Sequence, residues 1–354
     1  MSLPPDSWLF ALNPPRAHGE PLGAGAIKFA AEDFVVEERL GFSADGGDAH
    51  VLLKVQKRGL DTLALTRQLA RIAGVSSRDV GFAGLKDRHA ITTQWLTVPA
   101  SRPPIEWQGV AGDGFLVTQA LPHSRKLKRG ALKGNLFSIV LRDVTVDAEA
   151  LSHRIEVLKT HGVPNYFGAQ RFGRDGGNLD LVDRFASNNE LPYGREPRAF
   201  VYSAARSLIF NALLARRVLQ GTWNRLLPGE LVNLDGRNSW FVLEEFDEVL
   251  AQRLDRLDIH PTGPMAGKGA ALSGEVGALE ASVLAEFASL VERLSEAGLE
   301  ADRRPLRLAP TDLVAQLEGT QLHVQFGLPA GAYATVVVRE ILSTELPAQD
   351  AAND

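Results

Sequence analysis

The chain has 354 residues, 45% of them hydrophobic and 23% charged, so it can form one large domain or two ordinary ones with buried cores. The absence of cysteine excludes disulfides, thiolate metal sites and cysteine nucleophiles. The formal net charge of −5 gives no global sign of a polyanionic partner, so local charge must decide that question. No apolar run approaches the roughly 18 to 20 residues that span a bilayer, and the N-terminus lacks a signal-peptide layout. We therefore expect a cytoplasmic protein with no membrane partner.

Strand and helix patterns alternate in the first part of the chain. Asp61 is placed to cap a helix whose apolar residues recur at helical spacing, and Gly74 is placed to end it. Runs rich in β-branched and apolar residues predict strands within the segments 27–39, 50–59, 81–98 and 133–144. This order predicts an α+β fold, with a mixed or antiparallel sheet and flanking helices.

The pattern becomes mainly helical further along the chain. Helices are predicted at 151–162, 201–220 and 275–297, with a hairpin at 230–243 around Asp235-Gly236.

The strand pattern returns near the end of the chain, at 321–329, and is followed by a helix at 333–343 despite its three valines. We therefore expect a discontinuous domain formed by 1–160 and 309–354, interrupted by an insertion domain at 161–308.

One segment places a carboxylate among cations. Lys86, Asp87, Arg88 and His89 lie between two short strand-like runs. A carboxyl group with a pKa near its usual value of about 3.9 is ionised at neutral pH, and nearby cations favour that form, so Asp87 could act as a nucleophile or base. On the pattern alone, an ordinary solvated turn is the favoured interpretation, because runs of charge are usually solvated.

A second segment concentrates positive charge without any carboxylate. Residues 125–133 carry five cations and are followed by Asn135 and Phe137. Basic residues next to an aromatic ring suit RNA, because phosphates position the strand and a splayed base stacks on the ring. The alternative is a solvated loop that leads into a buried strand residue.

Other signatures of catalysis are missing. The segment around Gly263 and Gly267 is one residue too short for a P-loop, the eight histidines lack metal-ligand spacing, and no G-x-S-x-G occurs. The sequence therefore predicts neither a metal nor a small-molecule cofactor.

Five segments resemble the tRNA pseudouridine synthase D (TruD) family in order and spacing, and the resemblance spans nearly the whole chain. The segments are "FAGLKDRHAITTQW" (82–95), "LKGNLFSIVLR" (132–142), "VPNYFGAQRFG" (163–173), "SAARSLIFN" (203–211) and "LPAGAYATVVVRE" (328–340). The resemblance implies isomerisation of uridine to pseudouridine at position 13 of certain tRNAs, without a cofactor. It also implies a pseudouridine synthase catalytic domain that is interrupted by the family's insertion domain.

The same resemblance implies roles for individual residues. Asp87 corresponds to the catalytic aspartate, and Lys28 to the basic residue that pairs with it. Phe137 corresponds to the aromatic residue that stacks on the target base, and Asn135 would fix the neighbouring geometry. The further candidates for substrate contact are Phe34, Lys86, Arg88, His89, Phe326 and, as cleft residues that could equally be structural, Gln94 and Arg171. Among them, Lys86, Arg88 and His89, together with the cations of 125–133, are the candidates for phosphate contacts.

Several alternatives stay open at this point. Asp87 could add covalently to the ribose or the base, or could deprotonate C2′ to give a glycal. A retaining glycosidase would need Asp87 together with Glu37 or Glu38, because that chemistry uses two carboxylates. A non-catalytic RNA chaperone would keep the basic surface without turnover. No long heptad pattern or exposed apolar stripe stands out, so we expect a monomer.

Overall fold

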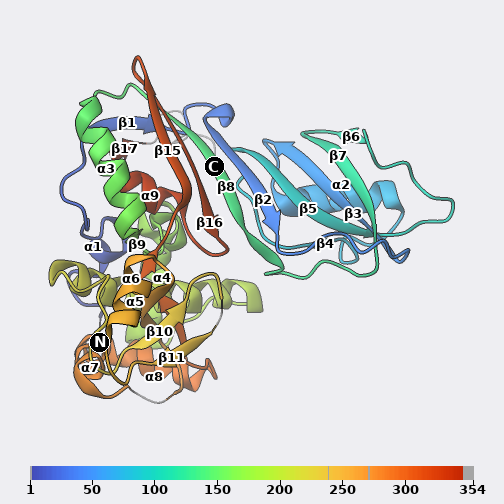
Figure 1. Ribbon diagram of the computed structural model, residues 1–354. Coiled ribbons are helices and arrows are strands. Elements are labelled where there is room, and N and C mark those ends of the chain that lie inside the picture. The colour runs from blue at the N-terminus through green and yellow to red at the C-terminus, as the bar shows by residue number, and fades with distance from the viewer. Residues whose placement is uncertain (1, 238, 270–271, 346–354) are drawn as a thin grey trace. The chain divides into compact units, whose positions relative to one another are not determined.

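A computed structural model describes residues 2–237, 239–269 and 272–345 (Figure 1). The chain divides into two compact units. The sheet unit contains Leu22–Ile155, Thr311–Gly331 and the segment from Leu342, and the helical unit contains Met1–Pro21, Glu156–Pro310 and Ala332–Ile341. Among the described residues, no helix is long and apolar enough to cross a membrane. The predicted discontinuous domain extends to residue 354, so its last nine residues lie outside the described part.

The sheet unit is built on one large mixed sheet. Its strands are β1 (Ala24–Ile27), β2 (Phe34–Leu40), β3 (His50–Arg58), β4 (Gly81–Phe82), β5 (Ile91–Pro99), β6 (Ala111–Gly112), β7 (Phe115–His123), β8 (Leu132–Arg142), β15 (Thr311–Glu318), β16 (Gln321–Pro329) and β17 (Ser343–Glu345). The main path runs β15-β16-β8-β2-β5-β3-β7-β6. Neighbours on it are antiparallel except for the parallel pair β2 and β5. Together with its helices, this sheet confirms the predicted α+β class.

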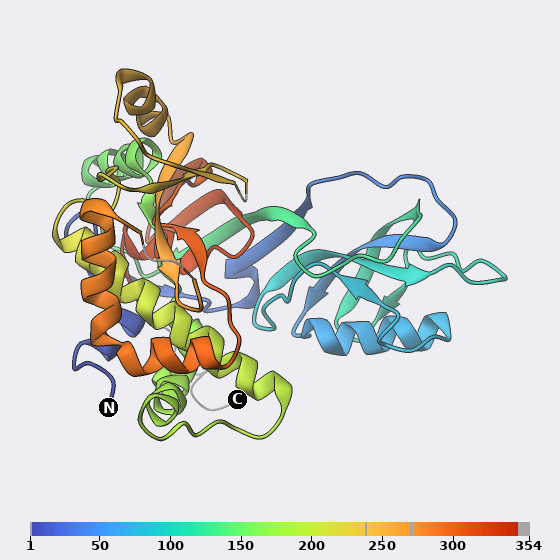
Figure 2. The same cartoon turned by 90° about the horizontal axis from the view of Figure 1, so that it is seen from below.

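The helix α2 (Thr62–Ala73) packs beside the sheet as its sequence predicts (Figure 2). The Asp61 carboxylate accepts a hydrogen bond of 2.7 Å from the Ala64 main-chain N–H, which caps the first turn. Gly74 ends the helix with a left-handed φ of 68°. Leu65 and Leu69 are fully buried in a core that they share with residues of β3, β5 and β7.

The predicted strand at 27–39 is interrupted. β1 ends at Ile27, and a 3-10 turn, η1 (Ala31–Asp33), precedes β2. The buried Asp33 carboxylate accepts a hydrogen bond from the Ala30 main-chain N–H and two from the Arg142 guanidinium, at 2.8 and 2.9 Å. These contacts stabilise a turn where the β-branched pattern alone predicts continuous strand.

The helical unit combines helices with a smaller sheet. Its helices are α1 (Ser7–Leu12), α4 (Gly177–Asn188), α5 (Arg195–Leu219), α6 (Glu248–Asp255), α7 (Gly274–Glu286), α8 (Ala288–Glu296) and α9 (Ala334–Arg339), with 3-10 turns η2 (Ala169–Phe172) and η3 (Arg174–Gly176). Its strands are β9 (Val163–Pro164), β10 (Leu231–Leu234), β11 (Trp240–Val242), β12 (Ile259–Met265), β13 (Asp302–Pro305) and β14 (Arg307–Leu308). The helix α3 (Ala148–His161) begins in the sheet unit and ends in the helical unit.

Two features of the helical unit differ from the prediction. The single helix expected at 275–297 is two helices, because Phe287 leaves helical geometry at φ −110° and ψ 25° and is buried. β12 was not predicted, because Pro261 and Pro264 are poor strand residues, yet it pairs with β10 on one side and β13 on the other. The predicted hairpin is present as β10 and β11.

Candidate active site

Of the candidate residues, Arg171 lies on η2 in the helical unit, and the others lie in the sheet unit, around the loop 83–90 between β4 and β5. The candidate residues that lie on strands are on neighbouring ones: Phe34 and Glu38 on β2, Asn135 and Phe137 on β8, and Phe326 on β16. Glu38 is paired with Asn135, and Phe137 with Phe326. Side chains at such directly paired positions lie on the same face of a sheet.

Asp87 forms an ion pair with Lys28. The Lys28 ammonium group contacts Oδ2 of Asp87, and the main-chain N–H of His89 donates a hydrogen bond of 3.1 Å to Oδ1. Partial burial by itself would raise the pKa of Asp87, but the Lys28 charge and these two hydrogen bonds outweigh it and hold the pKa below its usual value. Because 37% of its side-chain surface remains exposed, Asp87 is an ionised carboxylate that solvent and ligands can reach.

Lys28 itself has an unusual backbone. It directly follows β1 with a φ of 60°, a left-handed conformation that residues with a Cβ rarely adopt. Residues held in such conformations concentrate at functional sites, where the surrounding structure maintains them. Here the left-handed turn accompanies the contact of the Lys28 side chain with Asp87.

Lys57 is a buried cation behind the same loop. Its side chain is 1% exposed and donates a hydrogen bond of 2.7 Å to the main-chain carbonyl oxygen of Asp87. Burial lowers the pKa of Lys57 from 10.5 to about 8, although the charges of Asp87 and Asp61 act in the opposite direction. The sequence reasoning missed Lys57, but a signal was present, because it extends the every-second-residue pattern of the buried Leu53 and Val55.

The residue before Asp87 is fixed by a second ion pair. Lys86 is 6% exposed, and its ammonium group contacts Oε2 of the fully buried Glu38. The other carboxylate oxygen of Glu38 accepts a hydrogen bond of 3.1 Å from the Trp95 main-chain N–H. Lys86 is therefore held against the sheet in this structure, and a phosphate contact by it would require this pair to open.

Two further buried polar side chains support the loop. The hydroxyl group of Thr62 accepts a hydrogen bond of 2.9 Å from the Lys86 main-chain N–H and donates one of 3.0 Å to the side-chain oxygen of Gln94. Gln94 is fully buried, so of the two interpretations left open for it, the structure favours support over direct contact with a ligand.

Three phenylalanines form a row that leads away from the ion pair. The Lys28 ammonium group lies 4.6 Å from the centroid of the Phe34 ring. The Phe34 and Phe137 centroids are 6.2 Å apart with edge-to-face geometry, and Phe137 stacks on Phe326 at 5.6 Å. Phe34 and Phe137 retain 6% and 7% exposure, whereas Phe326 is fully buried. The three phenylalanine rings are thus linked to Asp87 through Lys28 by a chain of contacts.

Asn135 offers an unsatisfied acceptor beside this row. Its side-chain oxygen is buried, and within the described residues it has no hydrogen-bond partner. A buried acceptor of this kind costs free energy unless a ligand or water satisfies it.

The other two predicted contact residues are exposed on the loop itself. Arg88 Nε donates a hydrogen bond of 3.2 Å to the main-chain oxygen of Gly59, and His89 is next to it in the chain. Both side chains remain accessible on the loop that carries Asp87.

The glycosidase alternative needs Glu37 or Glu38 as a second reactive carboxylate, and both are engaged within the described part of the chain. Glu38 is buried with both oxygens engaged, and Glu37 contacts Lys54 at 2.7 Å. The site is therefore built around the single carboxylate of Asp87.

The fold and the site together describe an α+β protein in which one ion-paired carboxylate lies beside a row of aromatic rings on a sheet. The family model described as tRNA pseudouridine synthase D (TruD) matches residues 17–190 and 197–341. The chain belongs to the tRNA pseudouridine synthase D family.

Individual relatives agree with this assignment. The tRNA pseudouridine synthase D of Nitrosococcus oceani is 46% identical over 332 residues, which cover 92% of each chain. That of Methylococcus capsulatus is 43% identical over 331 residues, which cover 93% of this chain and 94% of the relative. The crystal structure of the putative tRNA pseudouridine synthase D from Methanosarcina mazei has the same fold, with a TM-score of 0.71 at 23% identity and coverage of 97% and 98% of the two chains.

Proposed function

We propose that this protein isomerises uridine to pseudouridine at position 13 of tRNA, with Asp87 as the catalytic carboxylate. The observation that carries the proposal is the ion pair of Asp87 with Lys28 next to Phe34 and Phe137, in a chain that belongs to the tRNA pseudouridine synthase D family. The enzyme acts as a monomer in the cytoplasm and uses no cofactor or membrane partner.

The reaction balances without any co-reactant. The bond between N1 of uracil and C1′ of ribose breaks, the base rotates, and a bond forms between C5 and C1′. The proton leaves C5, and N1 gains one. A carboxylate held ionised by Lys28 can begin this sequence, either by covalent addition or by removal of the C2′ proton, and its low pKa favours the reactive form at neutral pH.

Each supporting residue has a task in this scheme. The base is flipped out of folded RNA at a cost of a few kcal/mol, which stacking on Phe137 beside Phe34 and Phe326 offsets. The unpaired oxygen of Asn135 accepts a hydrogen bond from an N–H of the flipped uracil. Arg88 and His89 contact phosphates next to the target nucleotide.

The domain assignment is part of the proposal. We assign catalysis to residues 1–160 and 309–354 and the family's insertion to 161–308. The compact sheet unit holds every candidate residue except Arg171, which supports this division, although residues 2–21 and Ala332–Ile341 pack with the helical unit.

The test is pseudouridine mapping on unmodified tRNA transcripts. The protein is incubated without added cofactor, and carbodiimide labelling with primer extension locates pseudouridine. We expect a stop at position 13 that is absent with Asp87→Asn and retained with Asp113→Asn, which removes an exposed carboxylate elsewhere in the sheet unit. Folded protein that binds tRNA but produces no stop would refute the isomerase and support the chaperone instead.

A further inference from the structure

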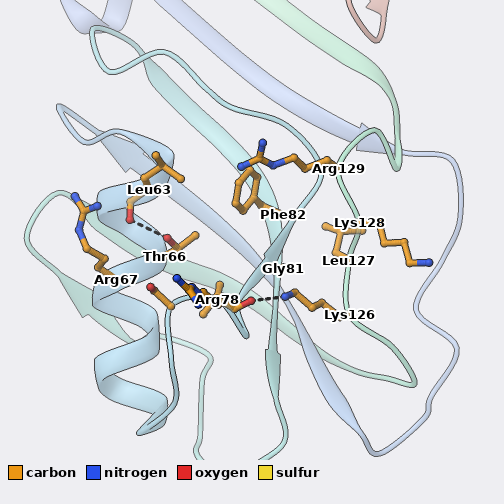
Figure 3. Close-up of a pocket in the computed structure, with 12 residues that line it drawn as sticks. Leu63, Thr66, Arg67, Arg78, Gly81, Phe82, Lys126, Leu127, Lys128 and Arg129 are labelled. Atoms are coloured by element: carbon orange, nitrogen blue, oxygen red, sulfur yellow. Dashed lines mark hydrogen bonds between the residues drawn. The ribbon is translucent and has the colours of Figure 1, made fainter. Parts of the chain in front are cut away.

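A cavity of about 600 Å³ in the sheet unit lies outside the catalytic residues described above (Figure 3). Its walls come from α2, from the segment 77–82 that includes β4, and from the segment 126–129. Five of its lining side chains are cationic: Arg67, Arg78, Lys126, Lys128 and Arg129. We call this cavity the basic pocket.

The charge of the basic pocket is unbalanced. Among the described residues that line it, none is Asp or Glu, although the whole chain carries 43 acidic against 38 basic side chains. Within the described ranges, no ion pair connects these five cations to a carboxylate of the chain. Five exposed cations around one cavity repel each other unless an anion joins them, so the pocket suits a ligand with several negative charges.

Contacts inside the pocket position two of its cations, Lys126 and Arg129. The Lys126 ammonium group contacts the main-chain oxygen of Arg78, which links two walls, and Figure 3 shows this contact as a dashed line. The Arg129 guanidinium lies 5.2 Å from the centroid of the Phe82 ring. Gly81, which directly precedes Phe82 in the pocket lining, has no room for a side chain, since a Cβ would come within 2.4 Å of the Thr97 hydroxyl.

The lining of the pocket is next in sequence to the loop that carries Asp87, and a main-chain hydrogen bond connects it to that loop. Phe82 in its lining is the last residue of β4, directly before the loop 83–90 that carries Asp87. The main-chain N–H of Gly130 donates a hydrogen bond of 2.7 Å to the Ala83 oxygen, so the segment 126–129 is attached to the first residue of that loop. A long polyanion can therefore contact the pocket while one of its nucleotides lies beside Asp87.

We propose that the basic pocket binds sugar-phosphate backbone of the tRNA substrate at nucleotides that flank the target uridine. This inference rests on the proposed function for the identity of the RNA. The pocket contributes affinity and positioning, and its residues do not touch the reacting atoms.

The first experiment compares two charge-matched double variants. Arg67→Gln/Arg129→Gln removes a cation from each of two pocket walls, and Arg102→Gln/Lys159→Gln removes two exposed cations outside it. We expect the pocket variant to raise Kd for tRNA on the order of tenfold. The negative slope of the logarithm of the association constant against log salt should become shallower by about 1.4 to 1.8, because each lost phosphate contact contributes about 0.7 to 0.9. The kcat at saturating tRNA should stay within about twofold of wild type in both variants.

The second experiment uses the absence of cysteine from the chain. Ser77→Cys places a unique thiol in the pocket lining, and Ser152→Cys places one on the exposed surface of α3. A photo-reactive aryl azide on each thiol is activated with bound tRNA, and primer extension maps the cross-links. We expect nucleotides that flank position 13 from Ser77→Cys and only background from Ser152→Cys.

Three outcomes would overturn the inference. The two double variants could show the same Kd and salt slope, the two thiols could give the same cross-links, or millimolar pyrophosphate could bind the pocket without displacing tRNA, which would make it a small-anion site. Wild-type protein that forms no pseudouridine would refute the proposed function separately, because tRNA binding and cross-linking are measured without turnover.

Discussion

The buried ammonium group of Lys57 donates a hydrogen bond of 2.7 Å to the main-chain oxygen of Asp87, the same residue whose carboxylate pairs with Lys28. Two lysines thus hold one aspartate, one through its backbone and one through its side chain. The adjacent Lys86 is tied to Glu38, so the loop is anchored at consecutive residues. Such anchoring fixes a reactive group before the substrate arrives, which is how pre-organised sites reduce the barrier to reaction.

Lys57→Met tests this positioning role. Methionine keeps most of the buried volume but cannot donate to the Asp87 carbonyl, so we expect kcat to fall by about tenfold or more with little change in Kd for tRNA. Lys54→Met is the matched control, because Lys54 lies on the same strand and contacts Glu37 rather than the loop. Single-turnover rates and filter-binding Kd values measure both quantities. Equal kcat for the two variants would contradict the role.

Lys57 also predicts a change of stability with pH. Its pKa is about 8 in the folded protein and 10.5 without the environment of the fold. Between these values the unfolded chain binds more protons than the folded one, so the contribution of Lys57 to the free energy of unfolding rises with pH. The difference in unfolding free energy, wild type minus Lys57→Met, should therefore increase from pH 8 to 10.5 in urea titrations. A difference that stays constant or decreases would show that the fold does not lower the pKa of Lys57.

The helix α2 was predicted from the sequence, whereas the burial of Lys57 was not. Asp61 and Gly74 define the ends of α2 through local hydrogen bonds and backbone conformation, and both are readable from the sequence. Lys57 is buried because of partners 30 residues away, and a lysine in a strand normally indicates an exposed position. Long-range pairing also produces β12, whose two prolines argue against a strand.

The candidate site also contains both residues that the sequence predicted and residues that it did not. The motif around Asp87 and the resemblance to the family identified Lys28, Phe34 and Phe137, and the structure brings them together. The buried pair of Glu38 with Lys86 was not foreseen, because charge density in a loop predicts solvation and only tertiary contacts reveal burial.

Lys28→Gln should shift the acid limb of the pH–rate profile. In the wild type, Lys28 lowers the pKa of Asp87 against the opposing effect of burial. Without this charge the pKa of Asp87 rises, so activity should be lost at a higher pH on acidification, and the loss of kcat should be partly recovered at higher pH. Arg58→Gln is a control that removes a cation of the same unit paired with Glu32. A profile of unchanged shape, merely scaled down, would show that Lys28 acts in another way than through the charge of Asp87.

Asn135→Ala should separate activity from stability. The buried Asn135 oxygen has no partner within the described residues, so removing this oxygen breaks no hydrogen bond there. We expect the free energy of unfolding to change by no more than about 1 kcal/mol, while kcat/KM falls by about tenfold or more because the uracil loses its acceptor. Urea denaturation and single-turnover assays give the two values. A large loss of stability with unchanged kcat/KM would reverse the assignment and make Asn135 structural.

Glu38→Gln and Glu37→Gln differ by one position in the chain and should differ strongly in stability. Glu38 is fully buried against Lys86, so removing its charge leaves a cation that is 6% exposed without its partner, and breaking such a pair costs about 3 to 5 kcal/mol. The side chain of Glu37 is 44% exposed and contacts Lys54, so its loss should cost no more than about 1 kcal/mol. Both variants should still form pseudouridine when folded, because the proposed reaction uses the carboxylate of Asp87 alone. Folded Glu38→Gln protein that binds tRNA but has lost turnover as completely as Asp87→Asn would instead revive a two-carboxylate mechanism.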